Sequence, residues 1–260
     1  MKYEIFNAHN GSKVKCKIWD AVKHPIGVVQ IVHDIDETPQ KYERFAEFLN
    51  KQGYIAIANC LRLHNETSKD VFADTVVDEF EILKSLKEKY QLPVFVFGHG
   101  YGSLIIQRLI EQTQLCTAGV CMSGTARYPL VTLWAGLLCA RIGGWIRGKN
   151  AHARVIELWS PIKSKRLSYG FYLSLFQNLI KLNHAVCPKM PLLIICGGRD
   201  VASANVRLAD TLYHAYRMHN MENLTFIIYP EIQRNLLHDC NYMDVQNDIL
   251  RFLNHRNFYK

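Results

Sequence analysis

The sequence contains no pair of cysteines at CxxC spacing, although it has eight cysteines in all. Most of them lie inside apolar, strand-like runs such as GVCM and IICG, so buried free thiols are expected rather than a disulfide framework or a zinc site. The histidines are scattered without the spacing of metal ligands. A reducing compartment, the cytoplasm, is therefore expected, with no metal and no cofactor.

The sequence also lacks a hydrophobic run long enough to cross a membrane. Its longest run, residues 130–140, stops at Arg141, whereas a membrane-spanning helix needs about 20 apolar residues. The first residues, MKYEIFNAHNGSKVKC, alternate between polar and apolar and have no continuous apolar segment of the kind that a secretory signal needs. A soluble protein, or one that binds to the surface of a membrane, is expected.

What the sequence does contain is a regular alternation of strand and helix patterns. Strand-like runs occur at residues 3–8, 13–19, 27–33, 54–59, 93–97, 117–122, 191–196 and 224–229. Helical spacing occurs at residues 42–51, 71–90, 103–111, 205–218 and 243–253. Strands that alternate with helices predict an α/β fold, here a mostly parallel sheet of eight strands with helices on both faces.

Residues 125–188 interrupt this alternation and are predicted to be an inserted cap, with residues 1–124 and 189–260 forming the core. The segment has no clear strand pattern, several short helix-like pieces and three of the four tryptophans. It holds nine Lys or Arg and one acid, Glu157, whereas the rest of the chain has 22 of each sign. The whole basic excess of the protein therefore lies in the cap, which predicts contact with an anionic membrane surface. No nucleic-acid motif accompanies the charge.

The stretch VFVFGHGYGSL, residues 94–104, predicts a strand, a tight glycine turn and a helix. Together with three other blocks it resembles the monoacylglycerol lipase and lysophospholipase branch of the α/β-hydrolases. GHGYGS stands where that family has GHSMGS, and IVHDIDETPQKYERFAEFL is similar to the family's strand ending in HG and to the helix that follows it. PLLIICGGRDVAS and IIYPEIQRNLLHDCNYMDVQNDILRFL resemble the segments that present the acid and the base. The resemblance implies an α/β-hydrolase fold.

The family's mechanism is a Ser-His-Asp triad with two backbone N–H groups that stabilise an oxyanion. Carried over to this sequence, the nucleophile position is Gly100, the acid is Asp200 and the base position is Arg234. His238 is an alternative base if the loop has been rebuilt. The N–H groups of Ile35 and Tyr101 are the expected oxyanion donors, the former following His33 and Asp34, where the family has HG.

No other nucleophile is evident. Ser103 and Ser123 lack an adjacent base in the sequence. Asp36 and Glu37 could form a carboxylate pair, but a solvated loop explains these two residues equally well. A glycine at the nucleophile position keeps the turn at positive φ without strain. Asp200 would be costly as a lone buried carboxylate, so it is expected to be ion-paired with Arg234 or within one water of it. The longer arginine could instead reach past Asp200 toward the space at Gly100 and bind an anion there.

Three functions are compatible with these features. The first is a hydrolase homologue, a pseudoenzyme, that has lost its nucleophile and base and binds a lipid-like or anionic ligand without hydrolysing it. The second is an active carboxylic-ester hydrolase, acting on a lysophospholipid or monoacylglycerol, with a rearranged triad that uses His238. The third is a peripheral membrane or protein-interaction role in which the cap is the contact surface.

Overall fold

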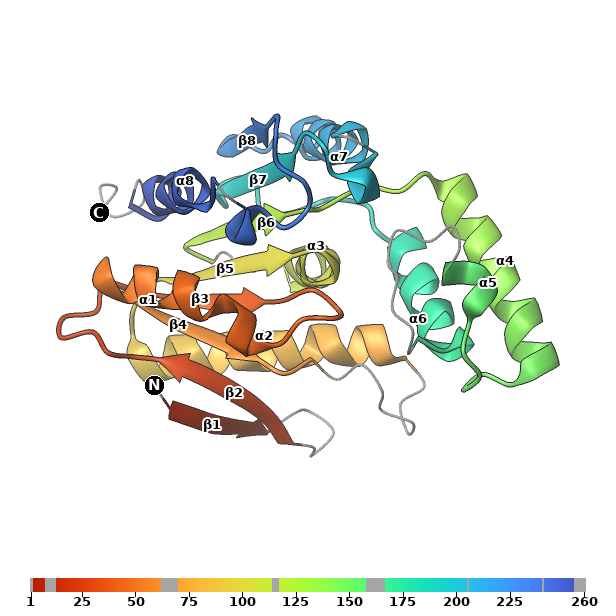
Figure 1. Cartoon of the computed structure of the whole chain (residues 1–260), viewed down its shortest axis with the longest axis horizontal. Helices are drawn as coiled ribbons and strands as arrows, with labels where there is room; N and C mark the ends of the chain where they lie inside the picture. The colour runs from red at the N-terminus through yellow and green to blue at the C-terminus, as the bar shows by residue number, and fades with distance from the viewer. Residues whose placement is uncertain are drawn as a thin grey trace.

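A computed structural model gives the fold of the chain as a single sheet with helices on both faces (Figure 1). It describes residues 2–7, 13–61, 70–113, 117–157, 167–204, 206–239 and 241–254. Three cysteines anticipated as buried, Cys16, Cys121 and Cys196, are buried and free, whereas Cys60 and Cys139 are free and exposed. Cys116 and Cys240 lie outside the described residues.

The sheet has eight strands, as predicted, in the order β1-β2-β4-β3-β5-β6-β7-β8. The strands are β1 (Lys2–Asn7), β2 (Lys13–Trp19), β3 (Gly27–Val32), β4 (Tyr54–Asn59), β5 (Val94–His99), β6 (Gly119–Ser123), β7 (Leu192–Gly197) and β8 (Leu224–Tyr229). Only the pairs β1–β2 and β2–β4 are antiparallel. Because every residue of β3, β4, β5 and β7 is buried, these strands read as mostly apolar runs in the sequence.

Helices cover both faces of the sheet, and the core is accordingly split into two apolar clusters. The helices between strands are α1 (Glu43–Lys51), α2 (Val71–Tyr90), α3 (Tyr101–Thr113) and α7 (Arg207–Met218), and α8 (Tyr242–Asn254) follows the last strand. Buried side chains of α1 and α8 belong to one cluster, and those of α2, α3 and α7 to the other. The predicted helix boundaries are confirmed to within two residues at each end.

The described residues between β6 and β7, in the segment predicted to be the cap, form three helices. They are α4 (Leu130–Arg147), α5 (Arg154–Glu157) and α6 (Tyr169–Ile180), so two of them are longer than the short pieces anticipated from the sequence. Figure 1 shows α4 and α6 side by side beyond the end of the sheet toward which the parallel strands point, with α4 outermost. Trp159, Lys163, Lys165 and Arg166 lie outside the described residues.

A buried carboxylate stands out in the core between β3, β4 and α2. Glu79 is fully buried, and its side chain accepts hydrogen bonds from the amides of Gln30 (2.7 Å) and Asn59 (2.6 Å). Burial raises the pKa of Glu79 to about 7, although both amide hydrogen bonds act in the opposite direction. The side-chain oxygens of Gln30 and Asn59 are buried without a hydrogen-bond partner among the described residues, so rotated amides could accept from a protonated Glu79.

We expect the protein to lose stability as pH rises, because of Glu79. Its folded pKa lies above the value of an unfolded Glu, so its contribution is fully present below pH 4.5 and is lost as pH rises through about 7. Between pH 5 and 8 the loss is about 2 kcal/mol. Urea denaturation of wild type and Glu79→Gln across this range isolates the effect. Parallel pH profiles for the two proteins would show that Glu79 is ionised throughout.

Candidate functional site

The site lies at the turn between β5 and α3, which keeps the geometry of a nucleophile elbow. Gly100 occupies the turn with φ of +56°, and α3 begins at the next residue, Tyr101. The Gly100 N–H donates to the carbonyl of Ser123 on the neighbouring strand (3.0 Å), which fixes the turn to the sheet. An L side chain in this backbone region is strained, whereas glycine is not.

Asp34, just after β3, places its carboxylate against this turn. Its Oδ1 accepts a hydrogen bond from the Tyr101 N–H (2.7 Å) and another from the Ile35 N–H (2.9 Å). These are the two backbone donors that the family resemblance identifies as an oxyanion hole. The structure therefore brings both predicted donors together, on an acceptor that belongs to the chain itself. The Tyr101 N–H is also at the positive end of α3, where a carboxylate is stabilised.

The Asp34 carboxylate also fills the space that a nucleophile would need. A Cβ atom built on Gly100 would lie at 2.5 Å or less from Oδ1, Oδ2 and Cγ of Asp34. Real Cβ contacts essentially never come this close. A serine at position 100 and the observed Asp34 conformation therefore exclude each other.

Arg234 binds the other oxygen of the Asp34 carboxylate. Its guanidinium donates to Asp34 Oδ2 from Nε (3.2 Å) and from Nη2 (3.1 Å). Burial alone would lower the pKa of Arg234, but the charge of Asp34, together with that of Asp200, outweighs it and raises the pKa. The pair is mostly buried, with about a fifth of each side chain exposed, 21% for Arg234 and 17% for Asp34.

Asp200 and Arg234 form no direct ion pair, because the Arg234 guanidinium reaches past Asp200 to Asp34. Asp200 is buried, and its Oδ1 accepts from the N–H of Ala202 (2.9 Å) at the start of a short 3-10 helix, η2 (Val201–Ser203). Its Oδ2 has no hydrogen-bond partner among the described residues. The structure thus follows the alternative predicted for Arg234, with Asp34 as the anion at Gly100.

His238, the alternative base, lies away from the acid. It is exposed at the end of the 3-10 helix η3 (Leu236–His238), and its ring lies 5.9 Å from the ring of Tyr42. Burial and the charge of Lys41 lower its pKa. In the described part of the chain no hydrogen bond or ion pair joins His238 to Asp200, so the geometry does not support the rearranged triad.

The other candidate groups have structural roles. Ser103 donates its hydroxyl to the carbonyl of Gly100 (2.6 Å), and Ser123 contacts the ring nitrogen Nδ1 of His99 (3.1 Å). Asp36 is exposed, as a solvated loop predicts, but Glu37 is not, since its side chain is only 6% exposed. Across the described residues no cluster of His, Cys, Asp and Glu suits a metal ion.

Glu37 holds the Asp34 loop in place. Its carboxylate accepts from the N–H of Asp34 (3.2 Å), the hydroxyl of Tyr42 (2.6 Å) and the ammonium of Lys41 (2.6 Å). Burial would raise the pKa of Glu37, but the charge of His99 and these donors lower it to about 2. The carboxylate is therefore ionised and fixes the backbone from which Asp34 projects.

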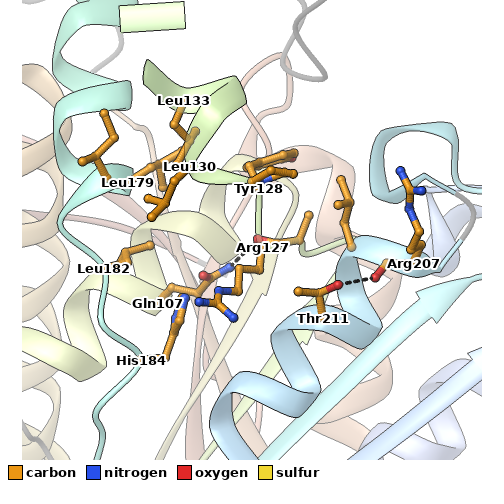
Figure 2. A pocket seen from close by; sticks show the side chains of 14 residues that line it. Gln107, Arg127, Tyr128, Leu130, Leu133, Leu179, Leu182, His184, Arg207 and Thr211 are labelled. Carbon is orange, nitrogen blue, oxygen red and sulfur yellow. Dashed lines mark hydrogen bonds between the residues drawn. The ribbon is translucent and has the colours of Figure 1, made fainter. Parts of the chain in front are cut away.

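A cavity of about 480 Å³ lies beside this site, where α4, α6 and α7 meet. Its apolar wall includes Leu130, Leu133, Leu179 and Leu182, and Figure 2 shows these four side chains on the side of α4 and α6. Polar groups line the remainder, namely Gln107, Arg127, His184, Arg207 and Thr211, with Arg207 and Thr211 on the side of α7 (Figure 2). None of the described lining residues is acidic.

Tyr128 connects the cavity to the elbow. It lines the cavity, and its hydroxyl lies within electrostatic range of Arg234, Asp200 and Asp34. Burial raises the pKa of Tyr128, while the charge of Arg234 opposes the rise, so the phenol remains neutral. The cavity and the closed elbow are therefore adjacent parts of one region.

Comparison with known proteins now places the chain in a family. Residues 23–241 match the family described as Serine aminopeptidase, S33. This match spans most of the sequence. The chain belongs to the S33 serine aminopeptidase family. No curated protein matches the sequence.

Solved structures show that the fold is that of an α/β-hydrolase. A thermostable carboxyl esterase from Bacillus coagulans, in complex with glycerol, has a TM-score of 0.83 at 20% identity, with 98% of each chain covered. A soluble variant of the Saccharomyces cerevisiae monoglyceride lipase has a TM-score of 0.71 at 18% identity, with 98% of this chain and 94% of that chain covered. The Paleococcus ferrophilus monoacylglycerol lipase has a TM-score of 0.69 at 19% identity, with coverage of 97% and 99%.

Within this S33 chain, sequence reasoning identified the elbow and both N–H donors but missed the residue that occupies them. The available signal was Asp34 itself, which follows His33 where the family pattern has a glycine. An acidic side chain beside an oxyanion donor, together with a glycine at the nucleophile position, forms a matched pair of changes. The arginines of the cavity, Arg127 and Arg207, were also missed because they lie 80 residues apart.

Proposed function

We propose that this protein is a non-catalytic member of the S33 family that binds an amphipathic anion without hydrolysing it. The observation that carries the proposal is the Asp34 carboxylate, which takes up both oxyanion donors and the space for a nucleophile at Gly100. A substrate carbonyl cannot be polarised there, because the donors are already used. Arg234, in the base position, stays protonated and cannot accept a proton.

The cavity beside the elbow supports the choice of ligand. Its leucines can enclose an alkyl chain, since apolar burial contributes about 0.8 kcal/mol per CH₂ group. Arg127 and Arg207 lie at the same cavity and can pair with a carboxylate or phosphate head. His184 is held neutral, because burial and the charge of Arg127 lower its pKa to about 4. Its Nδ1 is buried with no partner among the described residues and is available to a ligand.

Loss of catalysis is tested with purified wild-type protein. We expect neither labelling by a fluorophosphonate probe nor turnover of p-nitrophenyl butyrate, because a triad without its serine and histidine retains only the contribution of binding and of the oxyanion hole, and here Asp34 fills that hole. An active S33 esterase assayed in parallel shows that the reagents work. Stoichiometric labelling, or turnover that is lost in His238→Ala, would establish a working hydrolase instead.

Binding is tested by calorimetry with dodecanoate and with dodecanol, which share the alkyl chain and differ in charge. We expect dodecanoate to bind and the alcohol to bind at least about tenfold more weakly, as for loss of one charge-assisted hydrogen bond. Arg127→Gln/Arg207→Gln should remove this preference. Lys51→Gln/Arg217→Gln, an equal loss of charge on the exposed core surface, should retain it. Equal affinity for acid and alcohol in the wild type would refute an anion site.

A further inference from the structure

The outer face of α4 is apolar and uncovered in the described structure. Exposed apolar side chains recur along it at intervals of three and four residues, which places them on one side of the helix. They are Val131, Trp134, Leu138, Ile142 and Trp145, with exposures of 81%, 54%, 59%, 50% and 87%. Exposed apolar stripes of this length mark a contact surface rather than ordinary exposure of single residues.

The opposite face of α4 is packed into the protein. Its buried residues include Leu133, Leu137 and Ala140, which belong to the larger core cluster together with residues of α6. In the described part of the chain α4 is the one helix long and apolar enough to cross a membrane by length and composition. However, one face of α4 is packed into the core cluster, and Arg141 lies within the helix, so a spanning orientation would unpack that face and place a charge in the hydrocarbon. These features favour a helix that lies in the plane of a surface.

The surroundings of this face are basic. Arg141 and Arg147 lie on α4, and Lys149 and Arg154 follow it, all exposed. Among the described residues none of the four forms an ion pair with an acid, in contrast to Arg234 in the core. Glu157 is the single acid of the cap sequence. An apolar stripe bordered by cations that have no acidic partner among the described residues is complementary to a surface with apolar chains beneath anionic groups.

A groove at the end of α4 supplies a place for one such anionic group. It has a volume of about 420 Å³ and is lined by Arg141, Gly144, Trp145, Lys149, Leu173 and Gln177. The backbone of Lys149 is anchored, since its carbonyl accepts from the N–H of Gly170 (2.8 Å) at the start of α6. Two cations and the Gln177 amide therefore line one recess beside an exposed tryptophan, a side chain that favours the interface between lipid and water.

We propose that α4 docks in the plane of an anionic lipid bilayer, with its apolar stripe in the boundary of the acyl chains and a lipid phosphate in the groove of Arg141 and Lys149. In this orientation the buried face of α4, which lines the cavity of about 480 Å³ at Leu133, points away from the bilayer. The inference does not depend on the proposed function, because it uses none of the residues at Gly100 or in that cavity.

The test is flotation of the protein with vesicles of phosphatidylcholine, alone or with about 30 mol% phosphatidylglycerol. We expect binding to the anionic vesicles that weakens with added NaCl, and at least about tenfold weaker binding to neutral ones. Arg141→Gln/Lys149→Gln should reduce binding about 30-fold, at about 1 kcal/mol for each cation. The control Lys51→Gln/Arg217→Gln, with the same loss of charge outside the cap, should change it less than twofold.

The apolar contact has its own matched variants. Val131→Ser/Trp145→Ser should reduce binding at least about tenfold through lost apolar burial. Val201→Ser/Met218→Ser removes equally exposed apolar groups, 86% and 82%, away from the cap and should have no effect. Every altered side chain is exposed, so all variants are expected to fold. Far-UV circular dichroism and the melting temperature of each variant check this.

Four outcomes would overturn the proposal. Equal binding to neutral and anionic vesicles would remove the role of the cations, and unchanged binding of Arg141→Gln/Lys149→Gln would remove the groove. Stabilisation by inorganic phosphate without any vesicle binding would show that the groove takes a free anion instead. Self-association in sedimentation velocity that Val131→Ser/Trp145→Ser abolishes, again without vesicle binding, would assign the stripe to a second copy of the chain.

Discussion

Replacing Gly100 by serine, the nucleophile of the family, is expected to lower the free energy of unfolding by about 4 kcal/mol rather than to create an enzyme. The new Cβ would overlap the carboxylate of Asp34, which is held by two backbone N–H groups and by Arg234. Relief of the overlap requires Asp34 to leave these donors. Equilibrium denaturation in urea measures the loss.

The matched control is Gly148→Ser at the end of α4. Gly148 also has a positive φ, +88°, but no atom lies within 4 Å of the position that its Cβ would take. This substitution introduces backbone strain alone and should cost about 1–2 kcal/mol. If both substitutions cost the same, strain at positive φ would account for Gly100, and the overlap with Asp34 would have no energetic weight.

Asp34→Gly, which installs the residue found in the family, is expected to destabilise the protein by about 3 kcal/mol and to create a site for a small carboxylate. The variant leaves Arg234 unpaired and frees the N–H groups of Ile35 and Tyr101. Formate at ten times its dissociation constant should return about 1.4 kcal/mol of stability. Thermal denaturation with sodium formate, compared with sodium chloride at equal ionic strength, gives the measurement.

Wild-type protein is the first control for the formate experiment, since Asp34 already fills the site and formate should not raise its melting temperature. Asp34→Gly/Arg234→Met is the second, because it removes the cation that would pair with formate. An equal response of the wild type and Asp34→Gly to formate would mean that the anion binds elsewhere, and that the N–H groups at the elbow are not its site.

The sheet was predictable because strands that are buried on both faces consist mostly of apolar residues, which are visible as runs in the sequence. All residues of β5 are buried, so VFVFGH reads as a strand without ambiguity, and the glycine turn and helical spacing that follow fix the elbow. The amphipathic helices α1, α7 and α8 were located by the same physical signal of one apolar face. The length of α4 was underestimated, since its exposed apolar face removes the usual amphipathic pattern.

The chemistry of the site was only partly predictable, because it depends on side-chain direction. Arg234 could reach either Asp200 or the space at Gly100, and no sequence pattern distinguishes two acceptors within the reach of one guanidinium. The outcome was decided by Asp34, which offers Arg234 a carboxylate already oriented by two N–H groups. Asp34, Gly100 and Arg234 therefore form one unit, in which a carboxylate, the space for it and its counter-ion are each supplied by a different loop.

The most direct test of this unit is the coupling free energy between positions 34 and 100. In a double-mutant cycle, Gly100→Ser is measured in the wild-type protein and in Asp34→Gly by urea denaturation. The account predicts that its cost falls from about 4 to about 1–2 kcal/mol when Asp34 is absent, a coupling of at least about 2 kcal/mol. Additive effects of the two substitutions would show that the Asp34 carboxylate does not occupy the place of the nucleophile.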